Sequence, residues 1–252
     1  MHVVAQREHY DAVRAAVARE TLHAWAARQS AARPLQGRGV AWATRLASGR
    51  EVVVRHSHHG GLFAPLTRDL FLAPTRAPRE LDVSLRLRDA GVPTPAVVAF
   101  VTYTAFGPFC RADVATSLVA GADLPVSWAA APGQAGRDAI TDAVAVLLRA
   151  LHDTGAHHPD LNVKNVLISS TDGVPNAWVL DVDRVTFGRA GDDRIAGKNA
   201  RRLLESVARW KSAHGLDIAD VDLRRLAEAA GLDHVALRAA GRDHDALRAP
   251  SR

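Results

Sequence analysis

Sulfur and aromatic side chains are scarce in this sequence of 252 residues, which has one cysteine, one methionine and two tyrosines. A single cysteine, Cys110, allows no intramolecular disulfide, so we expect a reducing compartment, the cytoplasm. Aromatic residues make up 5% of the chain and form no stacking motif, which argues against a specific nucleic-acid partner.

Long hydrophobic runs are also missing. No segment approaches the roughly 20 apolar residues that a membrane-spanning helix requires, and the first 20 residues lack the apolar region of a signal peptide. Apolar residues nevertheless make up 48% of the chain and charged residues 23%, which is typical of a globular protein. We therefore expect a soluble or peripheral protein with a substantial core.

Lysine is the third scarce residue, since only Lys164, Lys198 and Lys211 occur and arginine carries the positive charge. The formal net charge of +5 suits an anionic partner, such as a nucleotide, a phospholipid surface or nucleic acid. An arginine-rich composition alone is the competing interpretation of this charge.

Hydrophobic periodicity divides the chain into a β-rich half over 1–116 and a mainly helical half over 117–252. In the first half we predict a helix-favouring segment over 10–28, strands at 40–46 and 51–56, a helix from about Arg79 that stops at Gly91 and Pro93, and strands at 96–106 and 109–119. In the second half we predict a helix over 137–155, strands at 165–169 and 177–182, and helices over 199–213 and 221–231.

Chemistry-bearing residues gather in "HHPDLNVKNVLIS" (157–169) and "WVLDVDR" (178–184). Asp160 and Asn165 lie in a loop before one strand, and Asp181 ends the next, so the returning chain can bring Asp181 beside Asn165. Phosphoryl transfer needs one carboxylate to orient the accepting hydroxyl. It also needs hard oxygen ligands for Mg²⁺. Asp160 suits the first role, and Asn165 with Asp181 the second, whereas the structural alternative is that they are turn formers and a strand-end cap.

This arrangement resembles the protein-kinase-like superfamily. "HPDLNVKN" matches the catalytic-loop pattern H-x-D-x-x-x-x-N, and Asp181 falls where the metal-binding acid of D-F-G belongs. The resemblance implies an α+β, bilobal protein-kinase-like fold, with a β-rich N-lobe and a mainly helical C-lobe. It implies that ATP and Mg²⁺ bind and that Asp160 is catalytic. It also implies that His158 supports the loop through a backbone hydrogen bond.

The same resemblance assigns nucleotide contacts to the first half. Gly37 and Gly39 in "QGRGVAW" would form a turn over the ATP phosphates, which is a weak signal because glycines are common in hairpins. Arg55 in "VVVRH" occupies the place of the usual phosphate-binding Lys, and Glu80 in "PRELDV" is its expected helix partner. A solvent-facing acid in the first helical turn is the alternative for Glu80.

More of the chain, from about 37 to 215, resembles the 3-deoxy-D-manno-octulosonic acid (Kdo) kinase and lipopolysaccharide core kinase family. The resemblance is carried by "VVVRHSHHGGLFAPLTRDLFL", "LRLRDAGVPTPAVVA", "CRADVATSLVAGADL", "LDVDR" and "GKNARRLLESVARWK". It implies phosphorylation of a Kdo hydroxyl on the lipid A inner core at the cytoplasmic face of the bacterial inner membrane. A basic surface would meet anionic lipid there through Arg68, Arg76, Arg79, Arg86 and Arg88.

Some assignments stay open at this point. Asn162, Lys164, Asp183 and Arg184 are candidates for acceptor binding or for support of the site. The chain departs from the family pattern at "HSHHGG" and at Val182, where an aromatic residue is usual. The alternatives are a kinase for an aminoglycoside, another sugar or protein serine, a non-catalytic nucleotide-binding module, and a basic nucleic-acid binder. No zinc role is expected for the histidines, which lack cysteine partners or an H-E-x-x-H helix: His56, His58, His59, His157 and His158.

Overall fold

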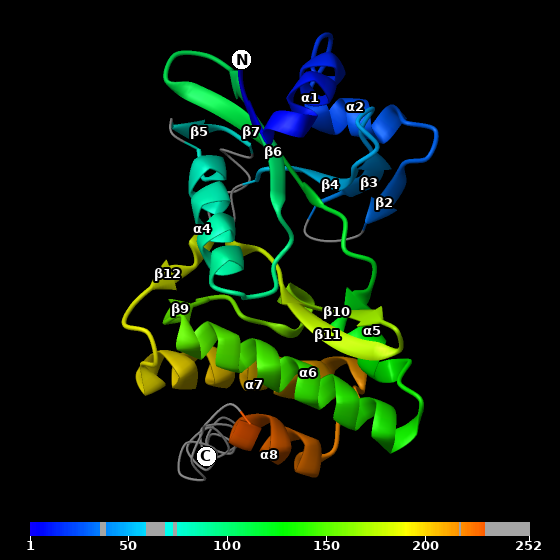
Figure 1. The fold of residues 1–252 in the computed structure, drawn as a ribbon, viewed down its shortest axis with the longest axis vertical. Coiled ribbons are helices and arrows are strands. Elements are labelled where there is room, and N and C mark those ends of the chain that lie inside the picture. Colours follow the sequence, from blue (N-terminus) through cyan, green and yellow to red (C-terminus); the bar gives the residue numbers. More distant parts are fainter. Residues whose placement is uncertain (36–38, 59–68, 73–74, 217, 230–252) are drawn as a thin grey trace, which may run out of the picture. The chain divides into compact units, whose positions relative to one another are not determined.

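The computed structural model describes residues 1–35, 39–58, 69–72, 75–216 and 218–229 (Figure 1). The chain divides into two compact units. Unit 1 combines Met1–Leu85 with Pro95–Val119, and unit 2 combines Arg86–Thr94 with the chain from Ala120 onward. None of the described helices is both long and apolar enough to cross a membrane.

Unit 1 is built on a seven-stranded antiparallel sheet of order β1-β6-β7-β4-β3-β2, with β5 paired to β7 (Figure 1). Two short helices and the start of a longer one accompany the sheet. Its elements are β1 (His2–Ala5), η1 (Arg7–His9), α1 (Tyr10–Ala16), α2 (Leu22–Arg28), β2 (Arg33–Leu35), β3 (Ala41–Arg45), β4 (Glu51–His56), β5 (Phe71–Leu72), α4 (Ala77–Asp89), β6 (Val97–Thr104) and β7 (Phe109–Ser117).

Alternation along the strands gives this sheet two different apolar faces. Val52 and Val54 of β4 and Ala115 of β7 pack with α1 and α2 in one core cluster. Val114 of β7 packs in a second cluster with Ala77 of α4. Because side chains alternate along β4, Arg55 and His56 lie on opposite faces of the sheet.

The helix-favouring stretch 10–28 forms two helices, α1 and α2. Thr21 starts α2 as its N-cap and accepts a hydrogen bond from the Ala24 amide at 3.1 Å. Strand β1 was not predicted and pairs with the edge of β6. The predicted hairpins and the helix that stops at Gly91 are present, with α4 beginning two residues before Arg79.

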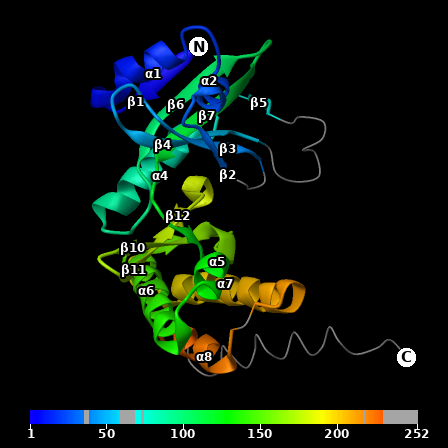
Figure 2. The same ribbon diagram turned by 90° about the vertical axis from the view of Figure 1, so that its right-hand side faces the viewer.

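Unit 2 is mainly helical, with small sheets of order β11-β10-β8 and β12-β9 (Figure 2). The long helices α6 and α7 pack against each other, and α8 contacts both. Its elements are β8 (Ala122–Asp123), α5 (Leu124–Ala129), α6 (Gly133–Asp153), β9 (Ala156–His157), η2 (Val163–Asn165), β10 (Val166–Thr171), β11 (Val174–Val179), η3 (Val182–Arg184), β12 (Thr186–Phe187), α7 (Asp193–His214) and α8 (Asp220–Ala229).

Helix α6 ends where the sequence predicts, because Gly155 adopts a left-handed conformation with φ +64°. A Cβ at this position would lie 2.5 Å from the Arg189 carbonyl oxygen. The Gly188 amide donates to the Gly155 carbonyl at 2.9 Å. Gly155 thus lets the segment before the loop 158–165 and the segment after β12 approach each other closely.

We predict that Gly155→Ala lowers the free energy of unfolding by about 3 kcal/mol or more, because the left-handed backbone strain is joined by a clash with backbone. Gly133→Ala is the matched control at the other end of α6, with φ +64° and no atom within 4 Å of the added Cβ. It should cost about 1–2 kcal/mol. Urea unfolding of both variants measures the difference, and equal losses would contradict the close-approach argument.

Candidate functional site

Arg55 and Glu80, expected from the sequence to be partners, form an ion pair in unit 1. Arg55 lies on the face of β4 opposite to Val54, and this is the face of the sheet that packs with α4. Glu80 lies in the first turn of α4. The Glu80 side chain is only 6% exposed and that of Arg55 is 32% exposed. A carboxylate at that depth requires a cationic partner. The alternative of a solvent-facing Glu80 is wrong.

The two predicted glycines have different outcomes. Gly37 lies outside the described residues, so the expected turn over the phosphates stays a prediction there. Gly39 lies just before β3, and a Cβ at this position would be 3.4 Å from the ring of His58. That is ordinary van der Waals contact, so Gly39 is not required by the space around it.

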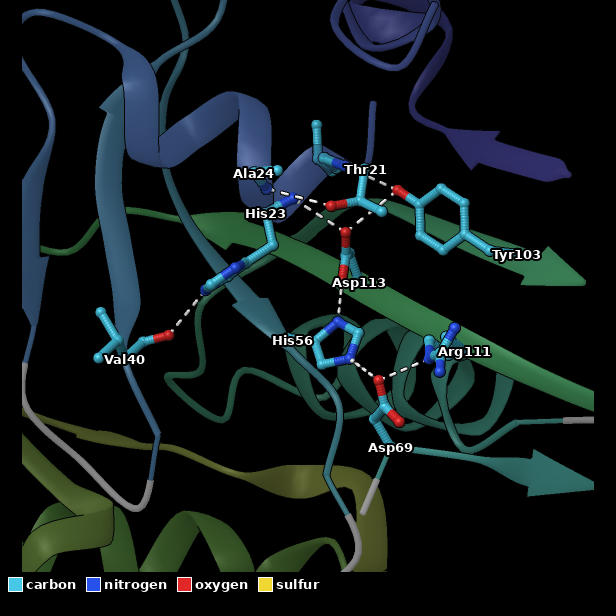
Figure 3. Close-up of polar contacts among 10 residues, drawn as sticks. Thr21, His23, Ala24, Val40, His56, Asp69, Tyr103, Arg111 and Asp113 are labelled. Carbon is cyan, nitrogen blue, oxygen red and sulfur yellow. Dashed lines mark hydrogen bonds and ion pairs between the residues drawn. The ribbon is translucent and has the colours of Figure 1, made fainter. Parts of the chain in front are cut away.

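His56, the neighbour of Arg55, points to the other face of β4 and lies between two carboxylates (Figure 3). Its Nδ1 contacts Oδ1 of the fully buried Asp113, and its Nε2 lies 3.0 Å from Oδ2 of Asp69. Arg111 Nε reaches the same Asp69 oxygen at 2.6 Å. Two cations and two anions therefore balance in this cluster when His56 is protonated.

Neutral donors complete the shell of Asp113. Its Oδ2 accepts hydrogen bonds from the His23 amide at 2.9 Å and from the Tyr103 hydroxyl at 3.1 Å (Figure 3). Tyr103 in turn accepts from the Leu22 amide at 2.7 Å. The buried acid thus ties the start of α2 to β6 and β4.

Burial and the charges of this cluster shift the pKa values of His56, His58 and Asp69. The hydrogen bond that His56 donates to Asp113 raises the pKa of His56 above 6.5, against the opposing effect of burial. Burial, and next the charge of His56, lowers the pKa of His58. Burial opposes ionisation of Asp69, but its bonds to His56 and Arg111 outweigh burial and lower the pKa of that carboxyl.

In unit 2, hydrogen bonds between residues close in sequence hold the loop 158–165 around Asp160. The Asp160 carbonyl accepts from Asn165 Nδ2 at 2.8 Å and from Asn162 Nδ2 at 3.1 Å. Asn162 also caps η2 by accepting from the Lys164 amide at 2.9 Å. Because Asn165 donates through Nδ2 to this backbone, its other amide atom, the oxygen, is the one suited to a metal ion.

The buried His158 connects this loop to the segment that carries Asp181. Its Nδ1 accepts from the Asp160 amide at 3.2 Å, and its Nε2 donates to the Leu180 carbonyl at 3.0 Å. The Leu180 amide donates to the Asn165 carbonyl at 2.9 Å. The backbone hydrogen bonds expected of His158 are therefore present, and Asn165 and Asp181 belong to directly bonded segments.

Asp181 lies two residues beyond β11, not at its end, and adopts a left-handed conformation with φ 58° and ψ 52°. Such a conformation is unfavourable for a residue with a Cβ and is often found at functional sites. The Asp181 side chain is exposed, whereas Val182 behind it is buried. Val182 thus fills with an aliphatic side chain the position where the family pattern has an aromatic one.

Three residues that sequence reasoning did not single out contact the loop from one face of α7. Asn199 accepts from the His158 amide at 2.9 Å and donates to the Ala156 carbonyl at 2.7 Å. Ser206 accepts from the Val163 amide at 3.2 Å. Arg202 Nη2 lies 2.6 Å from Asp160 Oδ1. The available signal was polar residues on the apolar stripe of an amphipathic helix, since Asn199 and Ser206 are buried beside Leu203.

The remaining candidates lie at the margin of this loop. Lys164 forms an ion pair with Asp123, and its Nζ lies 5.5 Å from the Trp210 ring. Asp183 and Arg184 lie in η3, half-buried and exposed respectively. Among the described residues there is no cluster of three or more His, Cys, Asp or Glu that could hold a metal ion by itself.

Comparison with known proteins identifies the family. The sequence model of the Lipopolysaccharide kinase (Kdo/WaaP) family matches residues 22–229. The chain belongs to this family. It is 30% identical over 199 residues to the 3-deoxy-D-manno-octulosonic acid kinase of Actinobacillus succinogenes, covering 76% of this chain and 80% of that one. It is 28% identical over 206 residues to the enzyme of that name from Vibrio vulnificus, covering 80% and 84%.

A solved structure of WaaP in complex with acyl carrier protein has a TM-score of 0.62 to this chain at 17% identity, covering 99% of this chain and all of that one. At that identity the likeness shows the fold alone. The predicted α+β, bilobal protein-kinase-like fold is confirmed. Membership of the family confirms the predicted enzyme class, an ATP-dependent phosphotransferase acting on a sugar hydroxyl.

We predict that stability depends on pH through His56. Because its folded-state pKa is raised above 6.5, its contribution is complete below that pH. The contribution is lost as the pH rises through the raised value. His56→Gln should lower the free energy of unfolding by about 3 kcal/mol in acid, since Asp113 loses its counter-ion, and should reduce the fall with pH.

Urea unfolding between about pH 6 and pH 9 measures both effects. The acid limb set by Asp69 lies below this window, since its pKa is lowered from 3.8. His2→Gln, at an exposed position of β1, serves as the control. A His56→Gln variant with the wild-type pH slope would contradict the charge balance described for the cluster.

Proposed function

We propose that this chain phosphorylates a Kdo hydroxyl of the lipid A inner core, with ATP as donor, in lipopolysaccharide biosynthesis. The observation that carries this proposal is the loop in which Asp160 and Asn165 are tied through His158 and Leu180 to Asp181. Its occurrence in a chain of the lipopolysaccharide kinase family supports the acceptor, because the relatives above are named as Kdo kinases.

Asp160 is the residue proposed to act on the acceptor. Its carboxylate orients the sugar hydroxyl and receives the hydroxyl proton as the oxygen forms its bond to the γ-phosphorus of ATP. The bond between the γ-phosphorus and the bridging oxygen breaks in the same displacement, and ADP leaves. The backbone of Asp160 is held on both sides by the His158 and Asn165 hydrogen bonds, which supports a fixed attack geometry.

Asn165 and Asp181 are proposed to hold Mg²⁺. The amide oxygen of Asn165 and the exposed carboxylate of Asp181 are hard oxygen ligands. Mg²⁺ sites in kinases commonly use one or two protein ligands and complete the shell with phosphates and water. When bound there, the ion would offset the negative charge of the phosphates. The left-handed conformation of Asp181 and its exposed side chain support a ligand role.

Arg55 is proposed to contact the ATP phosphates, with Glu80 keeping its guanidinium in place. Gly37 and Gly39 are proposed to cover those phosphates from the turn before β3. The partly exposed state of Arg55 beside the buried Glu80 supports this division, since one member faces outward and the other anchors it. Arginine can form bidentate hydrogen bonds to a phosphate, whereas lysine offers a single point charge.

The acceptor is anchored in a membrane, so we propose peripheral binding at the cytoplasmic face of the inner membrane. The exposed Arg76, just before α4, and Arg79 in its first turn support contact with anionic headgroups. Arg86 instead stacks 3.8 Å from the Phe187 ring centroid, and Arg88 donates to the Thr94 carbonyl at 3.4 Å. Arg68 lies outside the described residues. Asn162, Lys164, Asp183 and Arg184 remain candidates for contacts with the acceptor.

We predict that purified protein with ATP, Mg²⁺ and Kdo–lipid A yields a product heavier by one phosphate, detected by mass spectrometry. Asp160→Asn should lower kcat by about 10²–10⁴-fold, because the proton acceptor is lost. Asp153→Asn, at the exposed end of α6, is the control. Transfer only to aminoglycosides, another sugar or protein serine would overturn the Kdo assignment, and full activity of Asp160→Asn would overturn the role of Asp160.

We predict that Asp181→Asn weakens the affinity for Mg²⁺–ATP by about tenfold or more, or about 1.4 kcal/mol, because one ligand loses its charge. Calorimetry with and without Mg²⁺ tests this, since the variant and wild type should bind metal-free ATP alike. Asp172→Asn is a matched control, because Asp172 also has a positive φ, at 51° in the turn before β11. Equal Mg²⁺–ATP affinities in variant and wild type would contradict the metal assignment.

A further inference from the structure

We propose that Arg202 is a positioning residue that sets the orientation of the Asp160 carboxylate for the acceptor hydroxyl. The inference rests on the proposed function, since it requires Asp160 to be the residue that receives the proton. It assigns to α7 a direct part in the chemistry of a loop that lies about 40 positions earlier in the chain.

The contact is an ion pair between two partly buried groups. Arg202 Nη2 lies 2.6 Å from Asp160 Oδ1, and the two side chains are 29% and 18% exposed. A charge-assisted hydrogen bond of this length and burial is stronger and better directed than an ion pair at the surface. Arg202 therefore restrains the side-chain torsion of Asp160, whereas the loop hydrogen bonds restrain only its backbone.

Arg202 lies on α7 between two residues that are hydrogen-bonded to the loop. Asn199, Arg202 and Ser206 lie on one face of α7 at i, i+3 and i+7. Asn199 bonds to the His158 amide and the Ala156 carbonyl, and Ser206 bonds to the Val163 amide. The helix therefore contacts the loop both before and after Asp160. These contacts hold the α7 backbone at Arg202 in place relative to the loop, so its guanidinium meets the Asp160 carboxylate from a defined position.

A purely structural role would predict a different outcome from a positioning role. A structural ion pair contributes to stability and leaves the turnover of folded protein unchanged. A positioning pair changes kcat while ATP binding persists, because a small misplacement of a reacting group lowers the rate strongly. Groups that act as one unit also give non-additive losses when both are removed.

The experiment compares Arg202→Met, Arg202→Lys and Arg201→Met in the kinase assay with Kdo–lipid A. Arg201 is the matched control, because it is the preceding residue of α7, is 65% exposed and pairs only loosely with Glu205 at 3.8 Å. We expect Arg202→Met to lower kcat by about 10–100-fold with the KM for ATP unchanged. We expect Arg202→Lys to recover part of the loss, and Arg201→Met to match wild type. Thermal melting monitors folding.

A double variant separates the inference from the function on which it rests. In an Asp160→Asn background, Arg202→Met should add little further loss, since its target is already neutral. Wild-type kcat in Arg202→Met, or a full multiplicative loss in the double variant, would overturn the positioning role and leave the proposed function intact. If wild-type protein transfers no phosphate, the proposed function fails; if Asp160→Asn retains full activity, the proposed role of Asp160 fails; in either case the inference fails with it.

Discussion

The buried imidazole of His158 joins the segments on which the rest of the candidate site depends. One ring nitrogen accepts from the Asp160 amide and the other donates to the Leu180 carbonyl. Only the neutral ring with its proton on Nε2 can serve both partners. The side chain thereby fixes the loop of the proposed base against the residue that precedes Asp181. Residues 21 positions apart, from 160 to 181, become parts of one hydrogen-bonded frame.

A corresponding constraint operates in unit 1 through the two-residue period of β4. Arg55 and His56 are neighbours in sequence but lie on opposite faces, so each enters a separate charge system. Arg55 pairs with α4, and His56 joins the fully buried Asp113 beside α2. A one-residue shift of register would exchange these partners and place a guanidinium against Asp113. The His56 cluster therefore pins the register that orients Arg55.

Local features of the fold and site were predictable from sequence, because their physics is local. Helix α6 follows its apolar period to Gly155, and the strand predicted after Asn165 returns the chain so that the Leu180 amide, next to Asp181, bonds to the Asn165 carbonyl. The Arg55–Glu80 pair was also anticipated, from the family resemblance. The partners from α7 were not, since Asn199 and Arg202 reach residues about 40 positions away and no local motif carries that distance.

Two other features were not predicted from the sequence. Strand β1 is short and gains its stability from pairing with β6, about 100 residues later, so its own sequence gives little signal. The break between α1 and α2 depends on the Thr21 cap inside an alanine-rich stretch where propensity alone favours continuation. Of the "HSHHGG" stretch, which departs from the family pattern, residues 59–61 lie outside the described residues.

Arginine, rather than the scarce lysine, is the cation in two of the partly buried ion pairs described above. The arginines that pair with Glu80 and Asp160 are 32% and 29% exposed. Lys164, by contrast, is 47% exposed. A guanidinium is less strongly hydrated than an ammonium and binds carboxylate oxygens in fixed geometry, so it enters such sites at lower cost. Arg55, proposed to stand in for the usual phosphate-binding lysine, follows the same preference for arginine. In that proposed role it would keep the positive charge and exchange a mobile point charge for a planar group that Glu80 can orient.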